Sequence, residues 1–109
     1  MITISPEFDE EIPMWDVALE ALLREEYRKH KAPLTVDDIQ RLSVQYLIRF
    51  DDMMHTLFEL TVQGHWRYLS APDVIAEVTR EHMTALWADG RLFPERAREA
   101  YPGAWRALR

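Results

Sequence analysis

One long amphipathic stretch decides the fold; from Thr35 to Gln63 it runs TVDDIQRLSVQYLIRFDDMMHTLFELTVQ. At 100° per residue, ten of its apolar side chains fall within an arc of about 160°. Thr35 is a candidate N-cap followed by acidic residues, and Gly64 suits a helix end. The pattern predicts a central helix over 36–63, in which a break near Ser43 would keep the register. Its apolar face consists of Ile39, Leu42, Tyr46, Leu47, Phe50, Met53, Met54, Leu57, Phe58 and Leu60.

Further helices are predicted on both sides of this stretch. Apolar spacing and terminal charges indicate a first helix over 13–30. Ser70 with Pro72 favours a third helix over 70–89, and Pro94 favours a short helix over 93–101. The remaining ends are predicted to be an N-terminal arm, 1–12, and a tail, 102–109, with one last helical turn. Ile2, Thr3 and Ile4 alternate, but without a second convincing strand run an extended arm is favoured over a strand.

These segments predict a single all-α domain: a small bundle or orthogonal array of three to four main helices, with 13–101 as its helical core. The length of 109 residues fits one domain, and 48% hydrophobic residues can supply a core. The chain has no cysteine, which excludes disulfides, thiolate metal sites and thiol catalysis. No secretory signal pattern or membrane-length apolar run is visible, so we expect a cytoplasmic location.

The charge balance argues against nucleic acid as a partner, and the lack of a membrane-length apolar run argues against a membrane. The net charge is −6, whereas binding to a phosphate backbone draws on clustered Lys and Arg. The start of the central stretch is similar in pattern to a helix–turn–helix unit, but the segment after it carries Arg49 as its only cation. Charge is also uneven: residues 1–20 contain six acids and no Lys or Arg, and residues 90–109 contain five arginines. This contrast permits a contact between the chain ends, a head-to-tail contact between subunits or a basic patch facing a partner.

Several large aromatic residues lie off the helical stripes, where they either close the core or contact a partner. Aromatic and arginine side chains are enriched at protein interfaces. The candidate interface residues are Trp66, Arg67, Tyr68, Trp87, Tyr101 and Trp105.

Two histidines suggest a different hypothesis. His55 shares an edge of the central helix with Asp51, Asp52 and Glu59, and His82 falls in the middle of the apolar face of the predicted third helix. Such side chains can be helix-stabilising ion pairs and a hydrogen-bonded core histidine, or they can bind a transition metal. The candidate ligands are Asp52, His55, Glu59 and His82.

The sequence shows no nucleophile elbow and, with three glycines, no Gly-rich phosphate loop. The leading hypothesis is therefore a non-enzymatic, helical protein-interaction module of the accessory, adaptor or inhibitor type, which binds another protein, a second copy of itself, or both. The alternative is a metal-binding helical bundle. A third hypothesis is an acidic protein that blocks a nucleic-acid-binding surface on its target.

Overall fold

A computed structural model describes residues 15–108 of the chain. Within this range the chain forms five helices and one four-stranded sheet, so the protein is a mixed α and β domain and the all-α prediction is wrong. In chain order the elements are α2 (Val17–His30), β1 (Leu34–Thr35), α3 (Val36–Gln45), α4 (Phe50–Val62), β2 (Trp66–Ala71), β3 (Val74–Ala76), α5 (Arg80–Leu86), α6 (Pro94–Ala100) and β4 (Ala104–Ala107). The predicted arm over 1–12 lies outside the described residues.

The last strand in sequence is an inner strand of the sheet. All strand pairs are antiparallel and the order is β1-β4-β2-β3, so Trp105 of β4 has Leu34 on one side and Tyr68 on the other. The predicted C-terminal tail, with its last helical turn, is therefore wrong. A strand of four residues is too short to show a clear alternation, and it is defined here by hydrogen bonding to two distant segments.

The predicted helix over 70–89 is also wrong, because its first part is the turn of a hairpin. Pro72 and Asp73 connect β2 to β3, and Asp73 has a positive φ of 61°. Proline followed by a residue with positive φ is typical of a type II turn, so the Pro-Asp pair that resembles a helix start reverses the chain instead. The helix begins only at Arg80, after Thr79 as N-cap.

The predicted central helix is two helices, α3 and α4, joined by residues 46–49. Leu47 adopts a left-handed conformation with φ 56°, which ends the helical run at this point. The apolar register continues across the turn, so periodicity does not reveal it. The prediction of Thr35 as N-cap is confirmed: its hydroxyl accepts a hydrogen bond from the Asp38 amide, and the Asp38 carboxylate accepts one from the Thr35 amide.

Other local predictions are confirmed. α2 ends at His30, where Lys31 takes a left-handed conformation, and α6 begins at Pro94. Gly64 follows α4 with φ 87°. None of the helices in residues 15–108 has the length and apolar character needed to cross a membrane.

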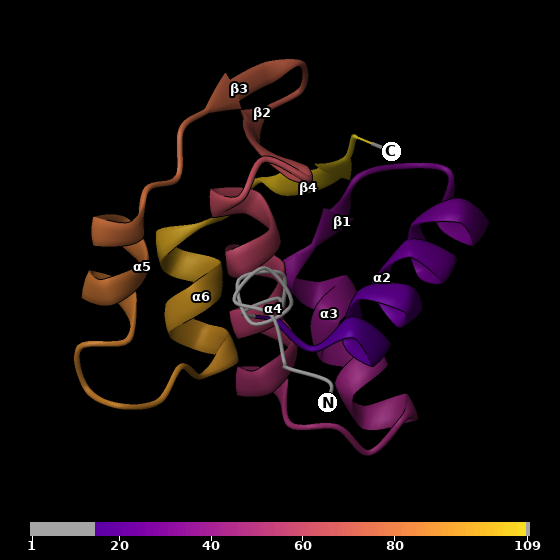
Figure 1. The fold of residues 1–109 in the computed structure, drawn as a ribbon, viewed down its shortest axis with the longest axis horizontal. Coiled ribbons are helices and arrows are strands. Elements are labelled where there is room, and N and C mark those ends of the chain that lie inside the picture. The colour runs from indigo at the N-terminus through magenta and orange to yellow at the C-terminus, as the bar shows by residue number, and fades with distance from the viewer. Residues whose placement is uncertain (1–14, 109) are drawn as a thin grey trace, which may run out of the picture.

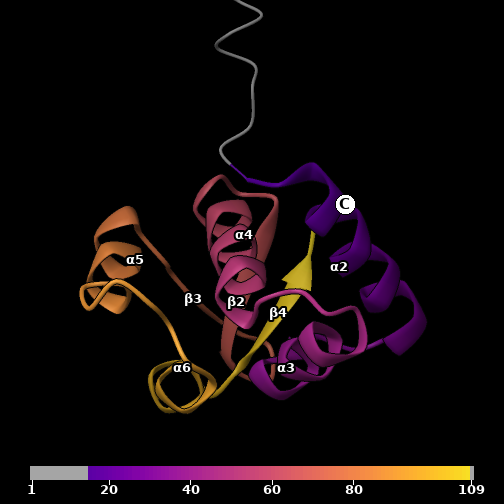
Figure 2. The ribbon, with the colours of Figure 1, turned by 90° about the horizontal axis from the view of Figure 1, so that it is seen from below.

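The helices lie on one side of the sheet, with α4 in the middle (Figure 1). Seen from below, α2 and α3 flank α4 on one side and α5 and α6 on the other (Figure 2). α4 buries nearly its whole circumference because it has neighbours in every direction. Its buried apolar side chains are Met53, Met54, Leu57, Phe58 and Leu60.

Candidate functional site

Most of the predicted interface aromatics belong to the core. Trp66, Tyr68 and Trp105 are buried, with the Trp105 side chain fully inaccessible, so burial removes these three from any free surface of the chain. The Phe58 ring packs edge-to-face against Trp105, Trp87 and Tyr101, with ring centroids 5.7, 5.4 and 5.0 Å away, whereas Trp66 packs against Tyr27. These residues lie off the helical stripes because they come from strands and helix ends.

The other three predicted interface residues keep part of their surface. Trp87 and Tyr101 are half-buried against the core, and Arg67 is exposed on the face of the sheet turned away from the helices.

The two histidines do not come together. His82 is the third residue of α5 and exposed; its Nδ1 accepts a hydrogen bond from the Thr79 amide at 3.1 Å, so it caps the helix rather than filling an apolar face. His55 is exposed on α4, with Nε2 3.9 Å from Glu59 Oε2. Asp52 is exposed and paired with Arg49. Among residues 15–108, no three His, Asp or Glu side chains are grouped so as to hold a metal ion.

Two buried carboxylates of α4 instead hold the segment around α5. Asp51 Oδ1 accepts a hydrogen bond of 2.5 Å from the Trp87 indole N–H. Glu59 is only 3% exposed, and its Oε2 lies 2.6 Å from Nη1 of Arg80. This hydrogen bond raises the pKa of the Arg80 guanidinium. Both acids therefore have identifiable structural partners.

Among residues 15–108, the two most exposed large apolar side chains are Leu47, in the turn after α3, and Val44, near the end of α3. Val44 is 70% exposed, Tyr46 42% and Leu47 92%. We call these three residues the turn patch. Leu47 combines its exposure with the left-handed backbone, which costs a residue with a side chain roughly 1–2 kcal/mol and is usually left to Gly, Asn or Asp. The turn patch therefore carries both local strain and unburied apolar surface.

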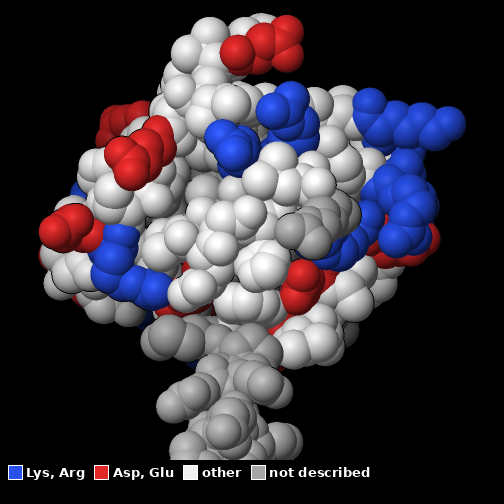
Figure 3. Space-filling model, turned by 45° about the horizontal axis from the view of Figure 1, so that its top comes forward, with Lys and Arg blue, Asp and Glu red and all other residues white. Residues whose placement is uncertain are grey.

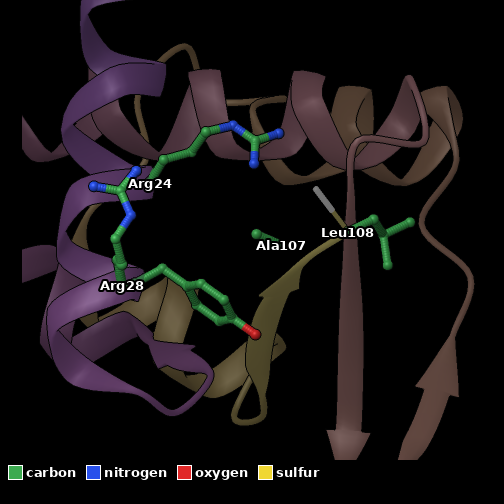
Figure 4. A pocket seen from close by; sticks show the side chains of 5 residues that line it. Arg24, Arg28, Ala107 and Leu108 are labelled. Carbon is green, nitrogen blue, oxygen red and sulfur yellow. The ribbon is translucent and has the colours of Figure 1, made fainter.

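A groove between α2 and β4 carries positive charge. It has a volume of about 550 Å³ and is lined by Arg24, Tyr27, Arg28, Ala107 and Leu108. Arg24 extends from α2 across the groove toward β4, Arg28 runs along α2 at the edge of the groove, and Ala107 and Leu108 lie on the opposite side (Figure 4). We call it the α2–β4 groove.

The positive charge continues onto the outer face of the sheet. On this face of the molecule, Lys and Arg side chains gather in the middle and along one side (Figure 3). Within the strands of residues 15–108, the only cations are Arg67 and Arg106. Arg67 and Arg106 are directly opposite each other on β2 and β4, an arrangement that is destabilising for like charges. Neither has an acidic partner within residues 15–108.

Comparisons of the chain with protein-family models, with curated proteins and with solved structures find no match.

Sequence reasoning placed Val44, Tyr46 and Leu47 inside a helix, where two of the three belonged to the apolar stripe. No local signal marks the turn, because Leu47 is not a residue type that favours positive φ. Arg24 and Arg28 follow each other at a helical spacing of four, which predicts only a shared helix face. The position of these arginines opposite β4 follows only from the tertiary structure.

Proposed function

We propose that this chain is a non-enzymatic protein-interaction module that binds its partner through the turn patch. The observation that carries the proposal is Leu47, an almost fully exposed leucine held in a strained backbone conformation. An exposed leucine contributes no buried apolar surface to the stability of the fold. A backbone with positive φ forms at a lower free-energy cost with Asn or Gly. Contact with an apolar surface of a partner would use both features.

The buried ionisable groups fit this proposal. Asp51 and Glu59 are occupied by Trp87 and Arg80, which attach the α5 segment to α4. They stabilise the scaffold on which the turn patch is displayed, and neither lines the α2–β4 groove.

A protein partner is favoured over nucleic acid by the surface of α4. α3 and α4 are joined by a short turn, as in a helix–turn–helix unit, but the second helix would need exposed cations and polar side chains to read a groove. Along α4, only Asp52 and His55 are exposed within the helix. An exposed aspartate repels phosphate.

The test is the replacement of Leu47 by Asn, which favours positive φ and removes the apolar side chain. We expect L47N to melt no lower than the unchanged protein, because about 0.5–1 kcal/mol of backbone strain is relieved. In quantitative pull-downs of the tagged full-length chain from its native cells, L47N should lose the stoichiometric partner. Sedimentation velocity on the purified chain should show whether that partner is a second copy.

The matched control is V74S, which removes another exposed apolar side chain, on β3 at the opposite end of the molecule from the turn between α3 and α4 (Figure 1). It should retain the partner. Equal capture by L47N and the unchanged protein, with both correctly folded, would contradict the proposal.

A further inference from the structure

Outside the turn patch, the α2–β4 groove is the best candidate for a binding site, because three of its properties point to the same class of ligand. It is basic, it is partly apolar, and it runs beside an unpaired strand edge. Its volume of about 550 Å³ lies within the range of roughly 300–1,000 Å³ typical of ligand pockets.

The groove is lined by two arginines and, among residues 15–108, by no acidic side chain. Arg28 is 72% exposed and its intrahelical partner Glu25 is 54% exposed, so this pair is readily exchanged for another carboxylate. Arg24 pairs with Glu20 and stands over the Trp66 ring, with its guanidinium carbon 6.0 Å from the ring centroid. Packing on the Trp66 ring orients Arg24, whereas the exposed Arg28 side chain can change its conformation.

Among residues 15–108, no strand lies next to the edge of β4 beside α2 at this point. β1 pairs only with Ala104 and Trp105 and then leaves the sheet. The Leu108 amide donates to the carbonyl of His65, on the β2 side. Since successive residues of a strand direct their backbone groups to opposite sides, the amide and carbonyl of Ala107 point toward the groove. They can hydrogen-bond to an extended backbone.

We infer that the α2–β4 groove binds an extended acidic segment of a partner protein. Carboxylates of that segment pair with Arg24 and Arg28, and its backbone lies along β4 at Ala107. Arg106, which directly precedes Ala107, and Arg67 opposite it add positive potential that attracts such a segment. This inference rests on the proposed interaction function but uses a different surface from the turn patch.

A peptide is favoured over a nucleic acid by the shape and setting of the groove. The Tyr27 ring and the Ala107 methyl group offer apolar contact, and a strand edge is specific for peptide backbone. The net charge of −6 for the whole chain repels a long polyanion, whereas a short acidic segment experiences mainly the local field.

The experiment is fluorescence anisotropy with the full-length chain and a labelled nonapeptide in which Val and Glu alternate. Its controls are the same peptide with Lys in place of Glu and a duplex DNA of similar size. We expect the Glu peptide to bind, the Lys peptide not to bind, and R28E to weaken binding by at least about tenfold, which corresponds to the loss of one charge-assisted contact.

R96E is the matched control, because it makes the same charge change on an exposed arginine of α6. It should change peptide affinity by less than about twofold, and circular dichroism should show both variants folded. Equal losses in R28E and R96E, or no binding of the Glu peptide, would overturn the inference. So would DNA binding that is tighter than peptide binding and sensitive to R28E.

A further outcome would assign the groove to the chain itself. Peptide binding that emerges only after Glu7, Asp9, Glu10 and Glu11 are replaced by their amides would identify the chain's own acidic segment as the occupant and overturn the partner inference. If R28E leaves peptide binding intact while L47N abolishes partner capture, the inference fails and the proposed function stands.

Discussion

At the scale of single residues, two tyrosines of the aromatic core make the stability of the fold sensitive to alkaline pH. Tyr68 and Tyr101 are in edge-to-face contact, with ring centroids 5.1 Å apart. Burial raises the pKa of both side chains, and for Tyr101 the neighbouring Tyr68 raises the pKa further. The Tyr68 hydroxyl also accepts a hydrogen bond from the Gly103 amide, which lowers the Tyr68 pKa. Burial is the larger effect for both tyrosines, so both pKa values are raised.

This arrangement predicts that Tyr101 contributes to loss of stability at high pH. A tyrosine ionises near pH 10 in an unfolded chain, and the folded-state pKa is higher, so the unfolded chain releases its proton first as the pH rises. The stability that comes from keeping Tyr101 un-ionised is fully present below about pH 10 and is lost as the pH rises above it. In Y101F, urea unfolding at pH 8 and pH 10.5 should show a smaller fall in the free energy of unfolding than in the unchanged protein. An identical fall would contradict the assignment.

At the scale of elements, α5 depends on side-chain contacts with α4 as well as on its short apolar face. Met83 and Leu86 are its buried residues. Glu59 is buried and reaches Arg80 through Oε2, while its Oε1 has no hydrogen-bond partner among the described residues. A buried carboxylate without its cation is costly, so the attachment is sensitive to loss of the arginine.

We predict that R80M lowers the free energy of unfolding by about 2 kcal/mol, less than for a fully buried pair because Arg80 is 45% exposed. Replacing Glu59 by Gln in the R80M background should recover about 1 kcal/mol, because the uncompensated charge is removed. Chemical denaturation of both single variants and the double variant measures this coupling.

The matched control is R28M, which removes an exposed arginine from its pair with Glu25. It should cost less than about 0.5 kcal/mol. Additive effects of the Glu59 and Arg80 changes would show that the two side chains act independently and would contradict the predicted coupling.

At the scale of the whole molecule, β4 joins β1 and β2, two strands that are distant in sequence, into one sheet. Trp105 packs on Phe58 with ring centroids 5.7 Å apart and on Tyr68 at 4.8 Å, so it connects the inner strand to the central helix. Its fully buried indole is among the largest side chains of the core. The stability of the domain therefore depends on a residue close to its C-terminal end.

Replacement of Trp105 by Ala should destabilise the fold by about 3–5 kcal/mol, the range for large aromatic truncations in a core. This is a large share of the roughly 5–15 kcal/mol by which domains of this size are stable. Thermal melts should show a strongly lowered midpoint or no cooperative transition. R106A, on the same strand but on its outer face, should be nearly neutral because it also relieves the repulsion from Arg67. A W105A variant with an unchanged melt would contradict the structure of the core.

The sequence by itself determined the elements whose causes are local. Thr35 and Asp38 form a capping box within four residues, Pro94 begins a helix, and the apolar side chains from Met53 to Leu60 define the buried core of α4. The candidate site could be predicted less well from the sequence. Arg67 is the one predicted interface residue that is exposed, and no pattern singled out Leu47 or the groove.

Only the tertiary structure decided the elements whose causes are distant in sequence. β1 has two residues and β4 four, and each is a strand because its backbone hydrogen-bonds to a segment far away in the chain. The same is true of the aromatic residues: Trp66 and Trp105 become core residues because the sheet turns them toward α4. Periodicity reports the environment of one continuous segment, whereas strand pairing and the closing of a core depend on which segments meet.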